Sequence, residues 1–320
     1  MEELTTTTAS TFIETLDTPT AADFIAAAVI FLISIIGLTG NTCVFLFSST
    51  LKSLRNSFGR FSSSQAFAEA ILCATFAFFY CPMVVFGVDV FMRSSSYVGL
   101  VLLYCYDVCM FSHLFIAVNR LCAIAFPLRY DSLFNDRNTK ILIFLAYAFA
   151  SFSSIYMHLT NNCLLPYVKF GWYFGVNTSA KCDVIRFYID FCKDFFIVSQ
   201  IVIVNVVTLV LIHMMSKSKS KQTSNWTGIH SKRRAMEVKF AKQVALQGLT
   251  FSTELILFFI VSARQSNPWM IFLCTTVAWS AVHSIDPLII ILLNAEFRQL
   301  LRGKKTSSTV QNSELNTNAI

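Results

Sequence analysis

The sequence predicts an all-α membrane protein, a bundle of seven transmembrane helices with its N-terminus outside the cell. Of its 320 residues, 55% are hydrophobic and only 13% are charged, which is too apolar a balance for a soluble domain of this length. Seven apolar stretches are each long enough to cross about 30 Å of hydrocarbon as a helix. The basic residues are unevenly distributed among the connections, and this indicates which way the spans point.

The first and fourth of these spans contain no Asp, Glu, Lys or Arg at all, and the others contain few. The connections are too short to fold independently, so one membrane domain is expected over residues 23–302, with an arm at 1–22 and a tail at 303–320. A short amphipathic helix at about 294–302 should follow the last span. The expected spans are about 24–47, 62–88, 97–126, 141–165, 189–215, 240–263 and 269–293.

Lysine and arginine near the ends of spans stay on the cytoplasmic side, so their positions predict orientation. Nineteen of the 25 lie around the first, third and fifth connections or after the last span. Residues 1–23 contain five acidic residues and no basic residue. We therefore expect the N-terminus outside and the tail inside. The net charge of +7 then reflects cations beside acidic membrane lipid, with no nucleic-acid partner.

The fourth connection, on the expected outer side, contains two cysteines and a glycosylation pattern. A disulfide between Cys163 and Cys182 is preferred in this oxidising compartment. The alternatives are two free thiols or a bond to Cys81, Cys105 or Cys274. An Asn-Thr-Ser run begins at Asn177 and matches the acceptor pattern for N-glycosylation, whereas the match at Asn225 lies on the expected inner side.

Polar side chains at bilayer depth cost several kcal/mol unless they are paired or hydrated, so they indicate functional positions. Asn41, Glu69 and Asp286 are expected to form an intramembrane polar network. The network could hold helices together, or it could be a hydrated pocket that rearranges between two states, and the sequence leaves both roles open. Candidate residues of a ligand pocket, each with packing as the alternative role, are Tyr106, Asp107, Glu254 and His283.

Enzyme motifs are absent from the sequence. It has no His-Glu-x-x-His, no Gly-x-Ser-x-Gly elbow, no phosphate-binding glycine loop and no Cys-x-x-Cys pair. The five histidines show no metal-ligand spacing, so neither an enzyme activity nor a cofactor or metal is expected. A transporter would usually show an internal repeat, and no such repeat is present.

The inner end of the third span carries a recognisable motif. Asn119-Arg120-Leu121, followed by Pro127-Leu128, resembles the Asp-Arg-Tyr motif of rhodopsin-like receptors and its Pro-Leu continuation. Asn119 replaces the usual acidic residue, which removes the local charge beside Arg120. In such receptors the arginine meets a cytoplasmic partner when the inner face opens, so Arg120 is expected to act in coupling to that partner.

Two further motifs lie in register with the first. Gly40-Asn41 resembles the Gly-Asn pair of the first span of those receptors. Asp286-Pro287 resembles their Asn-Pro-x-x-Tyr motif, with Ile290 in the tyrosine position and an amphipathic segment after it. Together the three motifs predict a rhodopsin-like G-protein-coupled receptor whose switch region includes Asn119, Arg120, Pro127, Asp286, Pro287 and Ile290.

Longer segments indicate a branch of that family. The sequence resembles the nematode serpentine chemoreceptors of class x over about residues 35–300, including the Cys163 and Cys182 pair. The segments that carry the resemblance are NSFGRFSSSQAFAEAILC, LLYCYDVCMFSHLFIAVNR and KQVALQGLTFSTELILFF. The resemblance implies a chemosensory receptor in the plasma membrane of sensory cilia, which binds an odorant or pheromone-like small molecule and activates a heterotrimeric G protein.

Ligand entry is expected from outside, between spans three, five, six and seven, with the inner end of span six then moving outward. The basic run from Lys232 to Arg234 is expected to contact acidic lipid. The residues from Thr306 to Thr309 are expected to be phosphorylated by a receptor kinase and then to bind arrestin. The rival function is a seven-span ligand-gated ion channel. Such a channel would place its N-terminus inside, against the distribution of basic residues.

Overall fold

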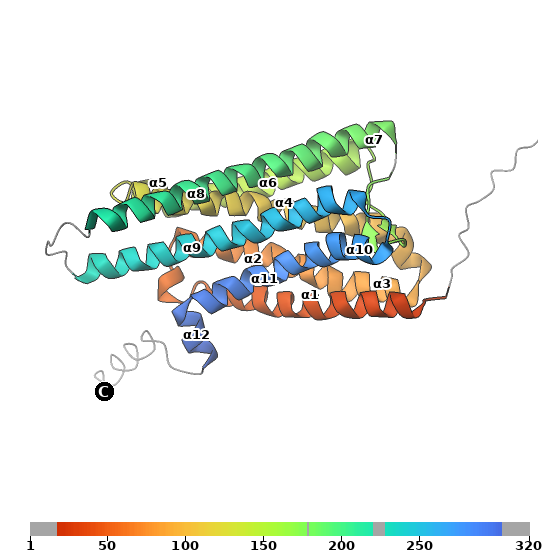
Figure 1. Ribbon diagram of the computed structural model, residues 1–320, viewed down its shortest axis with the longest axis horizontal. Helices are drawn as coiled ribbons and strands as arrows, with labels where there is room; N and C mark the ends of the chain where they lie inside the picture. The colour runs from red at the N-terminus through yellow and green to blue at the C-terminus, as the bar shows by residue number, and fades with distance from the viewer. Residues whose placement is uncertain (1–17, 178, 220–227, 303–320) are drawn as a thin grey trace, which may run out of the picture.

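The computed structural model describes residues 18–177, 179–219 and 228–302, with side chains described for all of these except 218–234. Within them, seven apolar helices long enough to cross a membrane run along an elongated bundle (Figure 1). The predicted seven-helix membrane bundle is therefore confirmed. The helices are Ala21–Phe47, Ser57–Phe86, Asp89–Ala125, Asp136–Thr160, Ala180–Lys217, Ala235–Arg264 and Pro268–Leu293.

The first and third spans are single helices, α1 (Ala21–Phe47) and α4 (Asp89–Ala125). The other five each contain one π-helical turn, η2, η3, η4, η5 or η7, which shifts the register of the side chains that follow. Their pieces are α2 (Ser57–Thr75), η2 (Phe76–Tyr80) and α3 (Cys81–Phe86); α6 (Asp136–Ser154) and η3 (Ile155–Thr160); α7 (Ala180–Ile185), η4 (Arg186–Cys192) and α8 (Lys193–Lys219); α9 (Gly228–Ile256), η5 (Leu257–Val261) and η6 (Ser262–Arg264); and α10 (Pro268–Phe272), η7 (Leu273–Val277) and α11 (Ala278–Leu293).

Polar caps fix where several of these helices begin. Thr20 and Asp23 form a capping box at α1, in which the Asp23 carboxylate accepts a 2.8 Å hydrogen bond from the Thr20 backbone N–H. Asn56 caps α2 by accepting a 3.1 Å hydrogen bond from the Gly59 N–H. Such caps satisfy backbone donors that would otherwise be left unpaired near the membrane.

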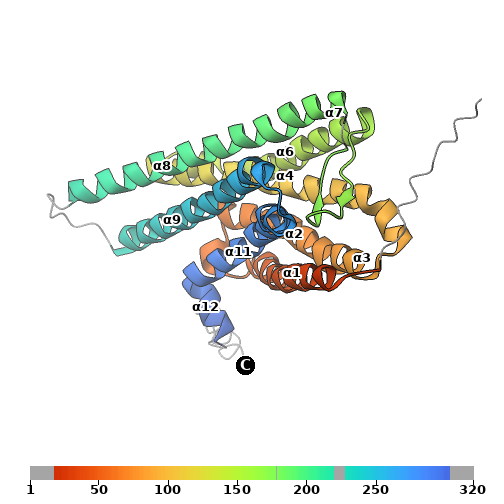
Figure 2. The same ribbon diagram turned by 45° about the vertical axis from the view of Figure 1, so that its right-hand side comes forward.

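The two ends of the bundle differ in structure, and we call them the tail end and the lid end (Figures 1 and 2). At the tail end, η1 (Lys52–Leu54), α5 (Tyr130–Leu133) and α12 (Ala295–Leu301) lie in or after the connections. At the lid end, β1 (Tyr167–Val168) and β2 (Tyr173–Phe174) form an antiparallel hairpin. The lid is defined here as residues 161–177. The expected fourth span, 141–165, thus ends earlier, because its last five residues leave the helix and enter the lid.

Hydrogen bonds fasten the lid to three helical spans. The hydroxyls of Tyr80 and Thr276 each donate a 2.7 Å hydrogen bond to the backbone carbonyl of Trp172. The indole N–H of Trp172 donates a 2.7 Å hydrogen bond to Asp23. Gly171 adopts a φ of +87°, which an L side chain would strain, and this turns β1 back toward β2. The lid is therefore a fixed cover over the helices.

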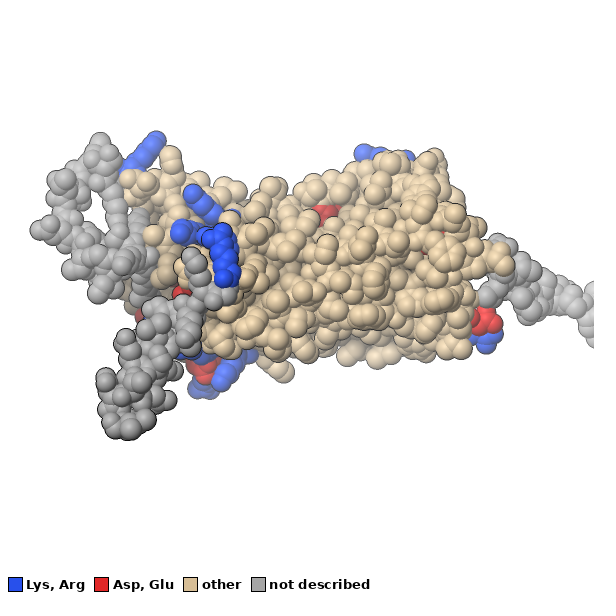
Figure 3. Space-filling model, turned by 90° about the horizontal axis from the view of Figure 1, so that it is seen from below, with Lys and Arg blue, Asp and Glu red and all other residues tan. Residues whose placement is uncertain are grey.

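Large apolar side chains cover the sides of the bundle, where lipid would surround them. Leu32, Phe144 and Phe196 are among those more than half exposed. Figure 3 shows a largely uncharged belt with a small acidic patch within it, while the lysine and arginine residues lie toward the ends. A surface of this kind is stable in hydrocarbon and not in water. The chain is a multi-pass membrane protein.

The Gly-Asn and Asp-Pro motifs meet where α1 crosses α11. A Cβ atom at Gly40 would lie 3.0 Å from Cγ of Pro287, so glycine permits this close approach. Next to it, the Asn41 side-chain amide donates a 2.9 Å hydrogen bond to the backbone carbonyl of His283. Ile290, one turn beyond Pro287, is buried in the apolar cluster of the tail half. The two motifs thus position one another.

Candidate functional site

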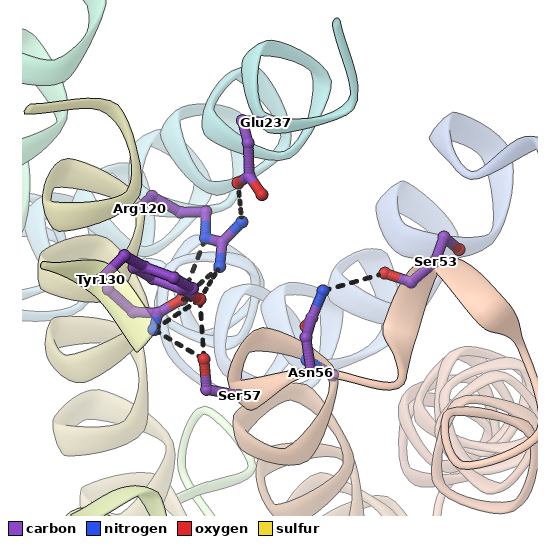
Figure 4. Close-up of polar contacts among 8 residues, drawn as sticks. Ser53, Asn56, Ser57, Arg120, Tyr130 and Glu237 are labelled. Atoms are coloured by element: carbon purple, nitrogen blue, oxygen red, sulfur yellow. Dashed lines mark hydrogen bonds and ion pairs between the residues drawn. The ribbon is translucent and has the colours of Figure 1, made fainter. Parts of the chain in front are cut away.

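The first candidate group, the arginine cluster, lies at the tail end around Arg120 (Figure 4). Arg120 is 1% exposed, and its guanidinium forms an ion pair with Glu237 of α9. Its Nε donates a 3.1 Å hydrogen bond to the Asn119 side chain, and one terminal nitrogen donates a 3.0 Å hydrogen bond to the Tyr130 hydroxyl. Asn119 also donates a 3.1 Å hydrogen bond to the Ser57 hydroxyl. One arginine therefore links α2, α4, α5 and α9.

Aromatic rings enclose the same guanidinium. Its central carbon lies 4.5 Å from the ring centroid of Phe58 and 5.6 Å from that of Phe240. A cation over an aromatic face gains about 0.5–2 kcal/mol. Pro127, by contrast, is exposed in the turn between α4 and α5. The arginine cluster is thus a closed contact between α4 and α9, and it has to open before any partner can reach Arg120.

The second group, the polar network, lies in the middle of the bundle and joins α2, α4 and α11. The Gln65 side-chain nitrogen lies 2.9 Å from a Glu69 carboxylate oxygen, 2.9 Å from His113 Nε2 and 2.7 Å from an Asp286 oxygen. His283 Nδ1 lies 3.5 Å from Glu69. All five side chains are buried. Glu69 and Asp286, two of the three residues expected in the network, both contact Gln65.

Donor atoms in this region are close enough to share a metal ion. Carboxylate, imidazole and thiolate are the donor types that bind zinc and other transition metals. In two overlapping sets the donor atoms lie within 4.8 Å of one another: Glu69, His113 and Asp286, and Glu69, Cys109 and His283.

Asn41 is the third residue expected in the polar network. Its side-chain amide contacts the network through the backbone carbonyl of His283.

The third group, the acidic cavity, lies beneath the lid. Three carboxylates line it, from Asp190, Asp194 and Glu254, together with lid residues such as Phe174. Tyr106 also lines the cavity, and its hydroxyl donates a 3.2 Å hydrogen bond to Glu254. Of the four expected pocket residues, Tyr106 and Glu254 therefore lie in its wall. The other two lie outside the wall, at the ion pair described next and in the polar network: Asp107 and His283.

Lys193 neutralises part of this acidic group from the start of α8. Its ammonium forms an ion pair with Asp107 and lies 3.3 Å from an Asp194 oxygen. The Lys193 side chain is only 18% exposed, although its position in the sequence suggested a residue of the outer surface. Buried charges inside a membrane are costly unless they are paired, and they mark functional positions, so the surroundings of Lys193 are a candidate binding site.

A disulfide between Cys163 and Cys182 joins the lid to α7, which confirms the preferred pairing. The backbone N–H of Asn177 donates a 3.0 Å hydrogen bond to the carbonyl of Leu164, and its side chain is half-buried. Burial raises the pKa of the Tyr167 hydroxyl well above its usual value, so this side chain of the lid stays neutral. The lid closes the acidic cavity with three apolar side chains, those of Leu165, Phe174 and Val176.

Comparison with known proteins decides the family. Residues 31–294 match the family model described as serpentine type 7TM GPCR chemoreceptor Srx. The chain belongs to this family. Serpentine receptor class X 45 of Caenorhabditis elegans is 32% identical over 295 residues, which cover 88% of this chain and 81% of that protein. The predicted membership of class x is therefore confirmed, and this protein is a serpentine G-protein-coupled receptor.

Two further comparisons agree with this assignment. Serpentine receptor class X-43 of Caenorhabditis elegans is 26% identical over 282 residues, covering 87% of this chain and 86% of that protein. The crystal structure of squid rhodopsin has the same fold, with a TM-score of 0.68 and 16% identity over 88% of this chain and 85% of that chain. The rhodopsin-like fold is thus retained in this serpentine receptor despite its divergent motifs.

Several residues of the three groups did not stand out in the sequence. Glu237 lies three residues before the expected sixth span, and in the sequence it looks like a solvated charge among basic neighbours. Gln65 and His113 are single polar residues in apolar helices, and only the fold brings them together. Asp190 and Asp194 lie four apart at the expected start of span five, and this spacing on one helix face was the available signal.

The lid bond gives a direct test of how this serpentine receptor matures. Cys163→Ser should reduce delivery to the cell surface several-fold, because the bond restrains the unfolded chain and holds the lid over the cavity. Surface labelling of an epitope-tagged chain measures this. Cys43→Ser, which removes a free cysteine, is the matched control and should leave delivery unchanged. Equal delivery of both variants would show that the bond is dispensable.

Proposed function

We propose that this receptor binds an external small molecule in the acidic cavity and activates a heterotrimeric G protein at the tail end. The lid end would face outward and the tail end the cytoplasm, as the distribution of basic residues predicts. The ligand would be odorant or pheromone-like, and the receptor would work in the ciliary membrane of chemosensory neurons. Both statements extend what the family implies.

The observation that carries the proposal is the closed pair between Arg120 and Glu237. It joins α4 to α9 at the tail end, while the Tyr106 hydroxyl of α4 donates a hydrogen bond to Glu254 of α9 at the cavity. The same two helices thus contribute to both groups. A ligand that separates Tyr106 from Glu254 would favour a different arrangement of α4 and α9, and in that arrangement Arg120 becomes accessible.

The polar network lies on the route between these two contacts. The ring of His283 lies 5.8 Å from that of Tyr106, and Phe251 of α9 packs against both His113 and His283. Buried polar groups with two arrangements are suited to a switch, because each arrangement must satisfy all of them. We assign the network this switching role, with Asn41, Glu69 and Asp286 as members.

Orientation is tested by mapping glycosylation and epitopes in intact cells. Under the proposal, Asn177→Gln should remove the shift in gel mobility that glycosidase also removes, and Asn225→Gln should have no effect. An epitope at the N-terminus should bind antibody without permeabilisation. An N-terminus accessible only after permeabilisation would favour the channel function over the receptor function.

Signalling is tested by expressing the chain in cells and applying volatile and water-soluble compounds, with calcium and cyclic nucleotide as readouts. Responses should disappear in matched cells that lack the G-protein α subunits. Ion currents that persist in a bilayer without G protein would instead establish a channel.

The proposed lipid contacts of Lys232 to Arg234 and the kinase and arrestin sites at Thr306 to Thr309 lie outside the described side chains.

A further inference from the structure

We infer that the ligand is a small organic cation, a protonated amine, held by Asp190, Asp194 and Glu254 against the aromatic wall of the acidic cavity. The inference rests on the proposed function, because it names the ligand class of the same cavity. It comes from the balance of charge, from a buried carboxylate that accepts no hydrogen bond from any described residue, and from the rings that line the remaining surface.

Negative charge exceeds positive charge around the cavity. Four carboxylates lie in or beside it, from Asp107, Asp190, Asp194 and Glu254. Lys193 is paired with Asp107, and Arg186, one turn before Asp190, is exposed. These two cations leave a deficit of positive charge in a space between membrane-spanning helices. Uncompensated charge there is costly, so a proton or a bound cation has to neutralise it.

Asp194 shows where the missing charge belongs. Its side chain lines the cavity and is 0% exposed, yet neither carboxylate oxygen accepts a hydrogen bond from any residue that the structure describes. The Lys193 ammonium lies 3.3 Å from one oxygen, but its hydrogen bonds go to Asp107 and Ser153. A buried acceptor left in this way normally has a partner. An ammonium group supplies up to three N–H donors and a positive charge at once.

The rest of the wall favours an organic cation over a bare metal ion. Aromatic rings line the cavity, contributed by Tyr106, Phe174, Phe258, Phe259 and Trp279. Their faces attract cations, and their apolar surface suits an alkyl or aryl substituent, whereas a hard metal ion needs several oxygen ligands. The cavity volume of about 30 Å³ holds a group no larger than an ammonium head, so the substituent of a larger amine requires the lining rings to move apart.

The competing explanation is that protons neutralise the carboxylates and that the ligand is neutral. The two explanations differ in what the cavity prefers. Protonated carboxyl groups would bind an alcohol about as well as an amine of the same shape. Ionised carboxylates would prefer the amine strongly and would reject the matching acid.

The test measures binding directly, without G protein, on the purified full chain in lipid nanodiscs at neutral pH. Thermal stability is followed with three matched trios of amine, alcohol and acid that carry methyl, isopentyl and phenylethyl groups. We expect at least one amine to raise the melting temperature at concentrations where its alcohol and acid do not. If no amine protects better than its alcohol, or if sodium or calcium chloride protects equally well, the inference is wrong.

Variants place the binding in the cavity. Asp194→Asn should weaken the apparent affinity for the amine about thirtyfold or more, because it removes a buried charge partner. Asp183→Asn, on the exposed side of α7, removes one carboxylate outside the cavity and should bind as the parent does. Glu254→Gln is the second cavity variant and decides the matter if Asp194→Asn does not fold. Unchanged affinity in the cavity variants would overturn the assignment.

The same panel separates this inference from the proposed function. Amine binding without any signalling in cells would count against the receptor mechanism and leave the ligand class standing. Signalling by alcohols or acids, but not by amines, would overturn the ligand class and leave the receptor mechanism standing.

Discussion

Replacing Glu237 with glutamine should raise signalling in the absence of ligand roughly tenfold. The ion pair with Arg120 joins α4 to α9 in the closed arrangement, and glutamine keeps the size of the side chain while removing its charge. A hydrogen bond to a charged group contributes about 1.5–3 kcal/mol, and about 1.4 kcal/mol corresponds to a factor of ten in an equilibrium. The measurement is basal G-protein activation per receptor at the cell surface.

Asp136→Asn is the matched control for this change. Asp136 also pairs with an arginine at the tail end, Arg60, but both side chains are about half exposed. Exposed ion pairs contribute little, so basal signalling should stay at the parent level. If the Glu237 and Asp136 variants behave alike, the pair with Arg120 does not hold the closed state.

Replacing Arg120 with alanine should abolish signalling, with or without ligand. This change breaks the same ion pair as the Glu237 variant. If Arg120 only held α4 against α9, the alanine variant would therefore be activated. We expect silence because Arg120 is assigned a second role, contact with the G protein after the helices separate. Signalling is measured at matched surface expression, since loss of a buried side chain also lowers stability.

Arg120→Leu is the accompanying variant, because leucine retains apolar contact with Phe58 and Phe240 while removing the charge. It should be as silent as the alanine variant and reach the surface more efficiently. Either variant signalling at the parent level would remove Arg120 from the coupling role. A rise in basal signalling would mean that Arg120 only holds the closed state and does not contact the G protein.

The fold was predictable because hydropathy and helix length act together in a membrane. Each span needs about 20 apolar residues, and the seven runs satisfy this without help from distant contacts. The ends of the helices were harder to predict. α4 begins at Asp89 and the fifth span at Ala180, both before the apolar run, because a helix can continue through the interface with charged residues on its surface.

The site was only partly predictable for a different reason. Motif spacing singled out Arg120, Asp286 and Pro287, since each recurs at a fixed place in rhodopsin-like sequences. Their partners are defined by contacts between helices far apart in the sequence, and no local pattern reports such contacts. Lys193 shows the difficulty, because a cation near a predicted boundary looks exposed until the neighbouring helices cover it with Asp107.

The central claim is that the contact between α4 and α9 at Arg120 controls access of a G protein. Its most direct test is nucleotide exchange on a purified heterotrimeric G protein, with the receptor in lipid nanodiscs and no ligand. Glu237→Gln should exchange faster than the parent, and the double variant with Arg120→Ala should fall to the rate of empty nanodiscs. Equal exchange by all three receptors at the rate of empty nanodiscs would contradict the claim.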